Sequence, residues 1–152
     1  MKLLDILDKN LINAELLAKT KKEALTDLAS MISEKEHLDV NELVAVLEDR
    51  EKLGSTGIGD GIAIPHGKFK GLHKLVVSFG KSKKGVNFQS IDGKATHIFF
   101  LLMAPENAAG THLKALARIS RLLKDKKLRE GLMNAKTSGE IYKIIEEEDN
   151  KL

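Results

Sequence analysis

The stretch GSTGIGDGIAIPHGK, from Gly54 to Lys68, decides the fold because it joins a glycine-rich loop to a short apolar segment. It holds five of the chain's twelve glycines and one of its two prolines. Glycine tolerates backbone conformations that other residues avoid, whereas Ile62–Ile64 is typical of a buried strand. Pro65 donates no backbone hydrogen bond and is expected to end that strand, and Gly67 is expected to let the chain turn behind His66. The stretch therefore presents one imidazole at the end of a sheet, with glycine amides nearby.

Helical patterns lie on both sides of this stretch. A Thr or Asp followed three residues later by Glu predicts helices that begin after Thr20, Asp39 and Thr137. Another helix is predicted from His112 to about Lys124, with Thr111 as its N-cap, and a short one in KKLREGLMNA, residues 126–135.

Strand patterns alternate with these helices. Thr96–Met103 is almost wholly apolar, which predicts a central strand buried on both faces. Gly80 and Gly85 bracket a lysine-rich connection suited to a hairpin. The remaining strand candidates are Ile62–Ile64, Leu75–Phe79, Val86–Phe88 and Leu11–Leu17. The pattern predicts a single α/β domain over residues 1–152, with a mixed β-sheet flanked by helices on both sides.

Composition excludes several classes of protein. The chain has no Cys, so disulfides, thiolate zinc sites and cysteine nucleophiles are excluded. Its longest apolar run, Ile98–Ala104, is too short to cross a membrane, and Asp5 and Asp8 interrupt the N-terminus where a signal peptide would be apolar. We therefore expect a cytoplasmic protein with no direct membrane insertion.

The net charge of +3 is unevenly spread, because the segment from Lys68 to Lys84 carries six lysines and no acidic residue. Such a segment can bind an acidic partner, or its lysines can simply protect sheet edges. Nucleic-acid binding is not expected, because the chain has no Trp, one Tyr and no stacking motif.

The glycine-rich loop does not match either familiar nucleotide-binding motif. Gly54 to Gly59 has the P-loop spacing, but Asp60 follows where Lys is required. In the dinucleotide fingerprint, the third glycine position would hold Ile62 or Ile64.

Metal and hydrolase chemistry are also poorly supported. A zinc site from His66, His73 and a carboxylate would match no standard ligand spacing, so no metal is expected. A triad of Ser55, His66 and Asp60 would lack the nucleophile elbow.

Two further residues could complete a site around His66. Arg50 lies on the helical face of Leu43 and Leu47, immediately before the glycine-rich loop, and His112 falls in the first turn of its helix. Taken singly, each residue is more often structural. An imidazole, a guanidinium, a second imidazole and glycine amides together would suit a phosphoryl group, but the sequence alone does not bring them together in space.

Two segments carry a family resemblance. REKLGSTGIGDGIAIPHGK (residues 50–68) and THLKALARISRLLKD (residues 111–125) resemble the IIA domain of the fructose–mannitol class of the bacterial phosphoenolpyruvate-dependent sugar phosphotransferase system. That class includes the nitrogen-regulatory IIA proteins, and the likeness covers nearly the whole chain. It implies a mixed sheet sandwiched by helices and a phosphohistidine at His66, with Arg50 and His112 holding the phosphoryl group.

The resemblance also implies partners and a loop that binds the phosphoryl group. The donor would be the phosphohistidine of the carrier HPr, the attacking atom would be His66 Nε2, and the acceptor would be a IIB domain. The alternative is a regulatory protein whose phosphorylation state selects its target protein. The resemblance implies no cofactor. The phosphoryl-binding loop would comprise Gly54, Ser55, Thr56, Gly57 and Gly67.

Overall fold

In the computed structural model, which describes residues 1–152, the apolar segment in the second half of the chain forms the central strand β6 (Thr96–Ala104). Side chains alternate across this strand, as the twofold period of a β-strand requires. Ile98, Phe100 and Leu102 enter one buried cluster, whereas Phe99 and Leu101 enter the other. The prediction of a central strand buried on both faces is confirmed.

A six-stranded mixed sheet is built around β6. The strands follow the order β1-β5-β6-β3-β2, and β4 also pairs with β6. β1 is parallel to β5, β5 is antiparallel to β6, and β3 and β4 are both parallel to β6. The bounds are β1 Leu7–Asn13, β2 Gly57–Gly59, β3 Ile62–Ala63, β4 His66–Lys68 and β5 Val76–Val86.

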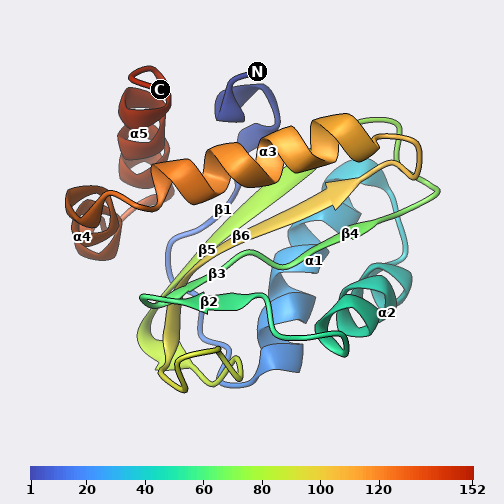
Figure 1. Ribbon diagram of the computed structural model, residues 1–152, viewed down its shortest axis with the longest axis horizontal. Coiled ribbons are helices and arrows are strands. Elements are labelled where there is room, and N and C mark those ends of the chain that lie inside the picture. Colours follow the sequence, from blue (N-terminus) through green and yellow to red (C-terminus); the bar gives the residue numbers. More distant parts are fainter.

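Helices cover both faces of the sheet, as Figure 1 shows. α1 and α2 pack on one face, and α3, α4 and α5 pack on the other. The predicted α/β class, with a mixed sheet between two helical layers, is confirmed. None of these helices combines the length and the apolar character needed to cross a membrane. Their bounds are α1 Lys21–Glu36, α2 Val40–Glu51, α3 Ala109–Leu122, α4 Lys126–Asn134 and α5 Ser138–Asp149, and a 3-10 turn covers Leu3–Asp5.

The segment that contains His66 runs along β6 in two pieces. β3 pairs Ile62 with Ile98, and β4 pairs His66 with Leu102. Between them the ladder is interrupted at Ile64, whose N–H donates instead to the carbonyl of Thr56 at 3.0 Å. Pro65 therefore marks a break in the ladder, as expected, but the pairing with β6 resumes one residue later. The break frees the Ile64 carbonyl for a different partner.

The predicted hairpin between Gly80 and Gly85 is wrong. Strand β5 runs continuously through this region, with an irregular register opposite β6 between Lys81 and Val86. Lys81 is only 7% exposed, and its ammonium donates to the carbonyl of Ala135 at the end of α4. A lysine stem packs like an apolar side chain when its charged end finds acceptors, and this allows the strand to continue.

Two other element boundaries differ from the prediction. The first strand lies at Leu7–Asn13 instead of Leu11–Leu17, because the pairing of Leu7 with Val77 sets its position. α3 begins at Ala109, so Thr111 is not its N-cap. The hydroxyl of Thr111 instead donates back to the carbonyl of Ala108 at 3.1 Å.

The three other predicted caps are present, and the cap of α2 gives a stability test. Asp39 accepts hydrogen bonds from the backbone N–H groups of Asn41 at 2.8 Å and Glu42 at 3.3 Å. We expect Asp39→Ala to lower the free energy of unfolding by about 1 kcal/mol, because these donors lose their partner. Urea denaturation measures the change. Asn41→Ala, an exposed neighbour, is the control, and an equal loss in both variants would contradict the capping role.

Candidate functional site

His66 lies at the start of β4, with its side chain partly exposed. Its Nδ1 is 2.8 Å from the carbonyl oxygen of Ile64, the group freed by the break in the ladder. A carbonyl oxygen only accepts hydrogen bonds, so Nδ1 must carry the proton of the neutral ring. The lone pair therefore belongs to Nε2, which is the nitrogen that can act as a nucleophile.

His112 lies beside His66 although 46 positions of sequence separate them. The ring centroids are 5.5 Å apart, with the rings edge to face. His112 is the fourth residue of α3 and is 6% exposed, and its Nδ1 is buried without a hydrogen-bond partner. The structure thus brings together the two histidines that the sequence singled out.

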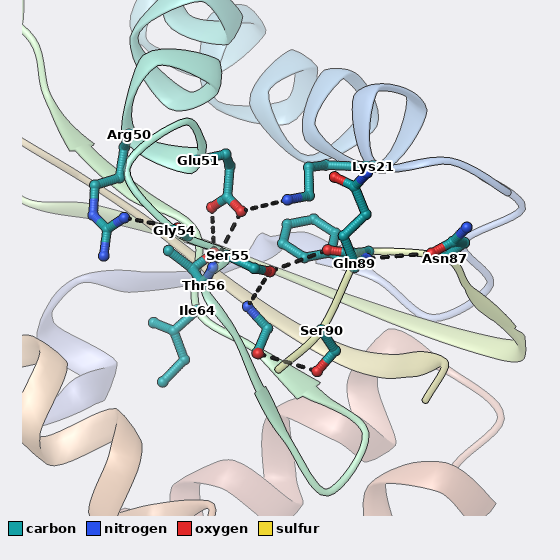
Figure 2. A network of polar contacts seen from close by, with 12 residues as sticks. Lys21, Arg50, Glu51, Gly54, Ser55, Thr56, Ile64, Asn87, Gln89 and Ser90 are labelled. Atoms are coloured by element: carbon teal, nitrogen blue, oxygen red, sulfur yellow. Dashed lines mark hydrogen bonds and ion pairs between the residues drawn. The ribbon is translucent and has the colours of Figure 1, made fainter. Parts of the chain in front are cut away.

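Arg50 lies in the last turn of α2 and points toward the glycine-rich loop. Its Nη1 donates to the carbonyl of Gly54 at 3.0 Å (Figure 2). None of the ion pairs in the protein includes Arg50. A guanidinium without a carboxylate partner keeps most of its donors available to an anion.

Both imidazoles have a lowered pKa. For His66 the main cause is burial, and the positive charge of Arg50 lowers its pKa further, against the opposing effects of the Ile64 hydrogen bond and Glu51. For His112 the main cause is also burial, followed by the charges of His66 and Lys68. Both rings are therefore mostly neutral near pH 7, because the usual pKa of histidine is about 6.5.

These lowered pKa values predict how stability depends on pH. When the pH lies between the folded and the unfolded pKa of a histidine, the unfolded chain binds more protons than the folded protein does. The stability contributed by neutral His66 and His112 is therefore complete above about pH 6.5. It is lost as the pH falls below that value. We expect the free energy of unfolding, measured in urea, to decrease between pH 7.5 and 5.5. This decrease should be smaller in the variant His66→Gln/His112→Gln, and an unchanged slope would contradict the assignment.

Most hydrogen-bonding groups of the predicted phosphoryl-binding loop already have partners within the protein. The amides of Gly54 and Thr56 donate to the backbone oxygen and the carboxylate of Glu51, respectively, and that of Gly57 donates to Ser55 Oγ. The Ser55 hydroxyl itself donates to the carbonyl of Phe88 at 3.1 Å. These three amides are therefore engaged within the protein, and their binding to a phosphoryl group stays a prediction.

Gly67 does not turn the chain as expected. It lies within β4, and a Cβ there would come within 2.7 Å of Val46 Cγ1 on α2. The glycine is therefore needed for close packing of the strand against the helix, which holds His66 beside the end of α2.

Glu51 is a residue of this region that the sequence analysis missed. Its side chain is nearly buried, and its carboxylate accepts both the N–H of Thr56, at 3.1 Å, and the Thr56 hydroxyl. Lys21, at the start of α1, forms an ion pair with it at 3.0 Å (Figure 2). The adjacent Arg50 drew attention to the end of this helix, but only the three-dimensional contacts show that Glu51 points inward.

A sizeable cavity lies apart from His66, Arg50 and His112. It has a volume of about 560 Å³ and is lined by the segments 14–19, 81–85 and 133–136. His66 instead lies on the sheet with its side chain partly exposed. An open position suits a group that must be reached by another protein.

Comparison with known proteins agrees with this fold. Residues 5–148 match the family model described as phosphoenolpyruvate-dependent sugar phosphotransferase system, EIIA 2. The match spans nearly the whole chain, and the chain belongs to this family.

Individual relatives come from two branches. A nitrogen regulatory protein of Bradyrhizobium diazoefficiens is 39% identical over 145 residues, which cover 95% of each chain. A fructose-specific EIIABC component of Bacillus subtilis is 35% identical over 150 residues, which cover 98% of this chain but only 24% of the relative. The crystal structure of the nitrogen regulatory protein IIA-Ntr from Neisseria meningitidis has a TM-score of 0.87 at 33% identity, covering 93% of this chain and 97% of that one.

Proposed function

We propose that this chain is a phosphocarrier that accepts a phosphoryl group on Nε2 of His66 from phospho-HPr and passes it to a IIB domain. The observation that carries the proposal is the hydrogen bond between His66 Nδ1 and the Ile64 carbonyl. This bond fixes the proton on Nδ1 and leaves the lone pair on Nε2 before the donor arrives. Membership of the EIIA family supports phosphoryl transfer as the class of reaction.

The proposed transfer is an in-line displacement at phosphorus. The Nε2 lone pair forms a new N–P bond while the N–P bond of the donor histidine breaks, and the donor nitrogen keeps that electron pair. Nδ1 retains its proton, so His66 needs no separate base. Such a transfer passes through a loose transition state and is catalysed mainly by positioning and electrostatics.

Arg50 and His112 would hold the phosphoryl oxygens. The free donors of Arg50 match the geometry of a phosphoryl group, and His112 lies edge to face with the receiving ring. The group would then pass from His66 to a cysteine thiolate of the IIB domain. Because the histidine-to-histidine step exchanges similar bonds, the proposal includes no metal and no cofactor. The proposal places the chain in the cytoplasm, as the sequence analysis expects.

A second function is favoured by the nitrogen regulatory relatives. The Bradyrhizobium protein covers 95% of this chain, which in turn covers 95% of that protein. In this alternative, phosphorylation of the same His66 decides which regulatory target protein binds. A phosphoryl group adds nearly two negative charges, which is enough to form or to disrupt an interface.

Intact-protein mass spectrometry tests the proposal and separates the two functions. The protein is incubated with phosphoenolpyruvate, enzyme I and HPr, and a IIB domain is then added. If one acid-labile phosphoryl group appears on the protein and is transferred to IIB, the phosphocarrier function is supported. If the group appears but remains on the protein after IIB is added, the regulatory function is favoured. A folded protein that gains no phosphoryl group would contradict both.

A further inference from the structure

The structure contains a continuous chain of polar contacts behind His66, of which the proposed transfer uses only the last, between the Ile64 carbonyl and His66 Nδ1. We propose that Glu51 is a positioning residue for His66, whose carboxylate holds the imidazole in its reactive tautomer through Thr56 and Ile64. This inference rests on the proposed function, because it concerns the same histidine.

Three successive links, made by four contacts, connect Glu51 to the imidazole. The Glu51 carboxylate accepts the N–H and the hydroxyl of Thr56, and the Thr56 carbonyl accepts the Ile64 N–H at 3.0 Å. The Ile64 carbonyl in turn lies 2.8 Å from His66 Nδ1. The N–H and the carbonyl of Ile64 are thus both held by hydrogen bonds at the break between β3 and β4. Without an anchor at Thr56, the Ile64 carbonyl would lose its defined direction.

The anchor formed by Glu51 and Thr56 is rigid because both side chains are buried and both carboxylate oxygens have partners. Glu51 is 8% exposed and Thr56 is 4% exposed, and a buried carboxylate is stable only when its oxygens are paired. Lys21 supplies the charge partner at 3.0 Å, and its ammonium also lies 4.8 Å from the centroid of the Phe88 ring. Figure 2 shows the Glu51 carboxylate between the ammonium of Lys21, which comes from α1, and Thr56 in the glycine-rich loop.

A glutamine at position 51 could not replace this function. Carboxylate oxygens only accept hydrogen bonds, which matches the three donors supplied by Thr56 and Lys21, whereas an amide presents an NH₂ group to some of them. Glu51→Gln therefore removes the ion pair with Lys21 and weakens the contacts with Thr56, because the charged acceptor is lost. The side-chain volume is almost unchanged, so the variant tests polarity rather than packing.

The charged groups around His66 permit a second readout. Arg50 and Glu51 face it from the end of α2, His112 faces it from α3, and Lys68 follows it on β4. Because the negative charge of Glu51 raises the pKa of His66, Glu51→Gln should lower that pKa further. A lower pKa leaves more neutral imidazole, so a slower transfer at about pH 8 could not come from protonation. If Glu51→Gln still transfers more slowly than the wild type at about pH 8, the loss of rate comes from the position of His66 and not from its protonation.

The test compares the full-length protein with Glu51→Gln, Thr56→Val and the control Glu48→Gln. Glu48 lies one turn earlier on α2 and takes no part in the chain of contacts. Glu48→Gln therefore removes an equal negative charge without disturbing those contacts. Long-range ¹H–¹⁵N spectra of the imidazoles give the tautomer of His66, and the kinetics of phosphorylation by phospho-HPr give the transfer rate.

We expect Glu51→Gln to reduce the population of the Nδ1–H tautomer and to slow transfer about tenfold, the usual effect of removing a group that orients a reacting side chain. Thr56→Val, which removes only the hydroxyl contact, should change both readouts in the same direction but less, and it carries the test if Glu51→Gln fails to fold. Glu48→Gln should behave as the wild type. A wild-type tautomer and rate in both Glu51→Gln and Thr56→Val would overturn the inference. The tautomer requires no donor protein, so it tests Glu51 even if the wild type accepts no phosphoryl group.

Discussion

His66→Ala is expected to abolish phosphorylation completely while leaving the fold intact. The substitution removes Nε2, the nitrogen that bears the lone pair while Nδ1 is bound to Ile64. It should not unfold the protein, because the side chain is partly exposed and β4 is held on β6 through its backbone. Intact-protein mass spectrometry after incubation with phosphoenolpyruvate, enzyme I and HPr measures the result.

A second histidine variant controls for general effects on the chain. His73→Ala removes an exposed imidazole seven residues later and should accept the phosphoryl group at the wild-type stoichiometry. Thermal unfolding of both variants confirms that folded proteins are compared. One acid-labile phosphoryl group on His66→Ala would contradict the assignment, because another side chain would then be the acceptor.

The layered fold could be predicted from sequence because its strongest patterns are local. The nearly continuous apolar run Thr96–Met103 identified β6, and Thr20, Asp39 and Thr137 are N-caps with side-chain hydrogen bonds in the structure. The errors arose where tertiary contacts override a local pattern. The segment from Gly80 to Gly85 reads as a hairpin, yet Lys81 finds carbonyl acceptors at the end of α4 and the strand continues.

The site was only partly predictable for the same reason. His66 and His112 were singled out by their local settings. Their ring centroids lie 5.5 Å apart because α3 packs across β6, the strand with which β4 pairs. Glu51 was missed because a carboxylate near a helix end is usually exposed. Its inward orientation depends on Lys21, a residue 30 positions earlier that belongs to another helix. Sequence spacing does not encode such a pairing.

Arg50→Met is expected to slow phosphorylation of His66 about hundredfold, which is the usual cost of removing one donor that stabilises developing negative charge. The guanidinium is held at the glycine-rich loop by a single hydrogen bond to Gly54 and has no carboxylate partner. Its positive charge lowers the pKa of His66, which shows that the two groups interact electrostatically. Methionine preserves much of the length of the stem and removes only the charge and the donors.

The pH dependence separates this role from an effect on the imidazole. Loss of the Arg50 charge should raise the pKa of His66, so part of the slowing below about pH 6.5 reflects protonation of the nucleophile. At about pH 8 the ring is neutral in both proteins, and the remaining difference measures stabilisation of the phosphoryl group. Lys52→Met, two residues later and paired only with Asp49 at the surface, is the charge-matched control and should transfer at the wild-type rate. If Arg50→Met matched the wild type at pH 8, the guanidinium would act on the protonation of His66 alone, and the phosphoryl oxygens would need another source of positive charge.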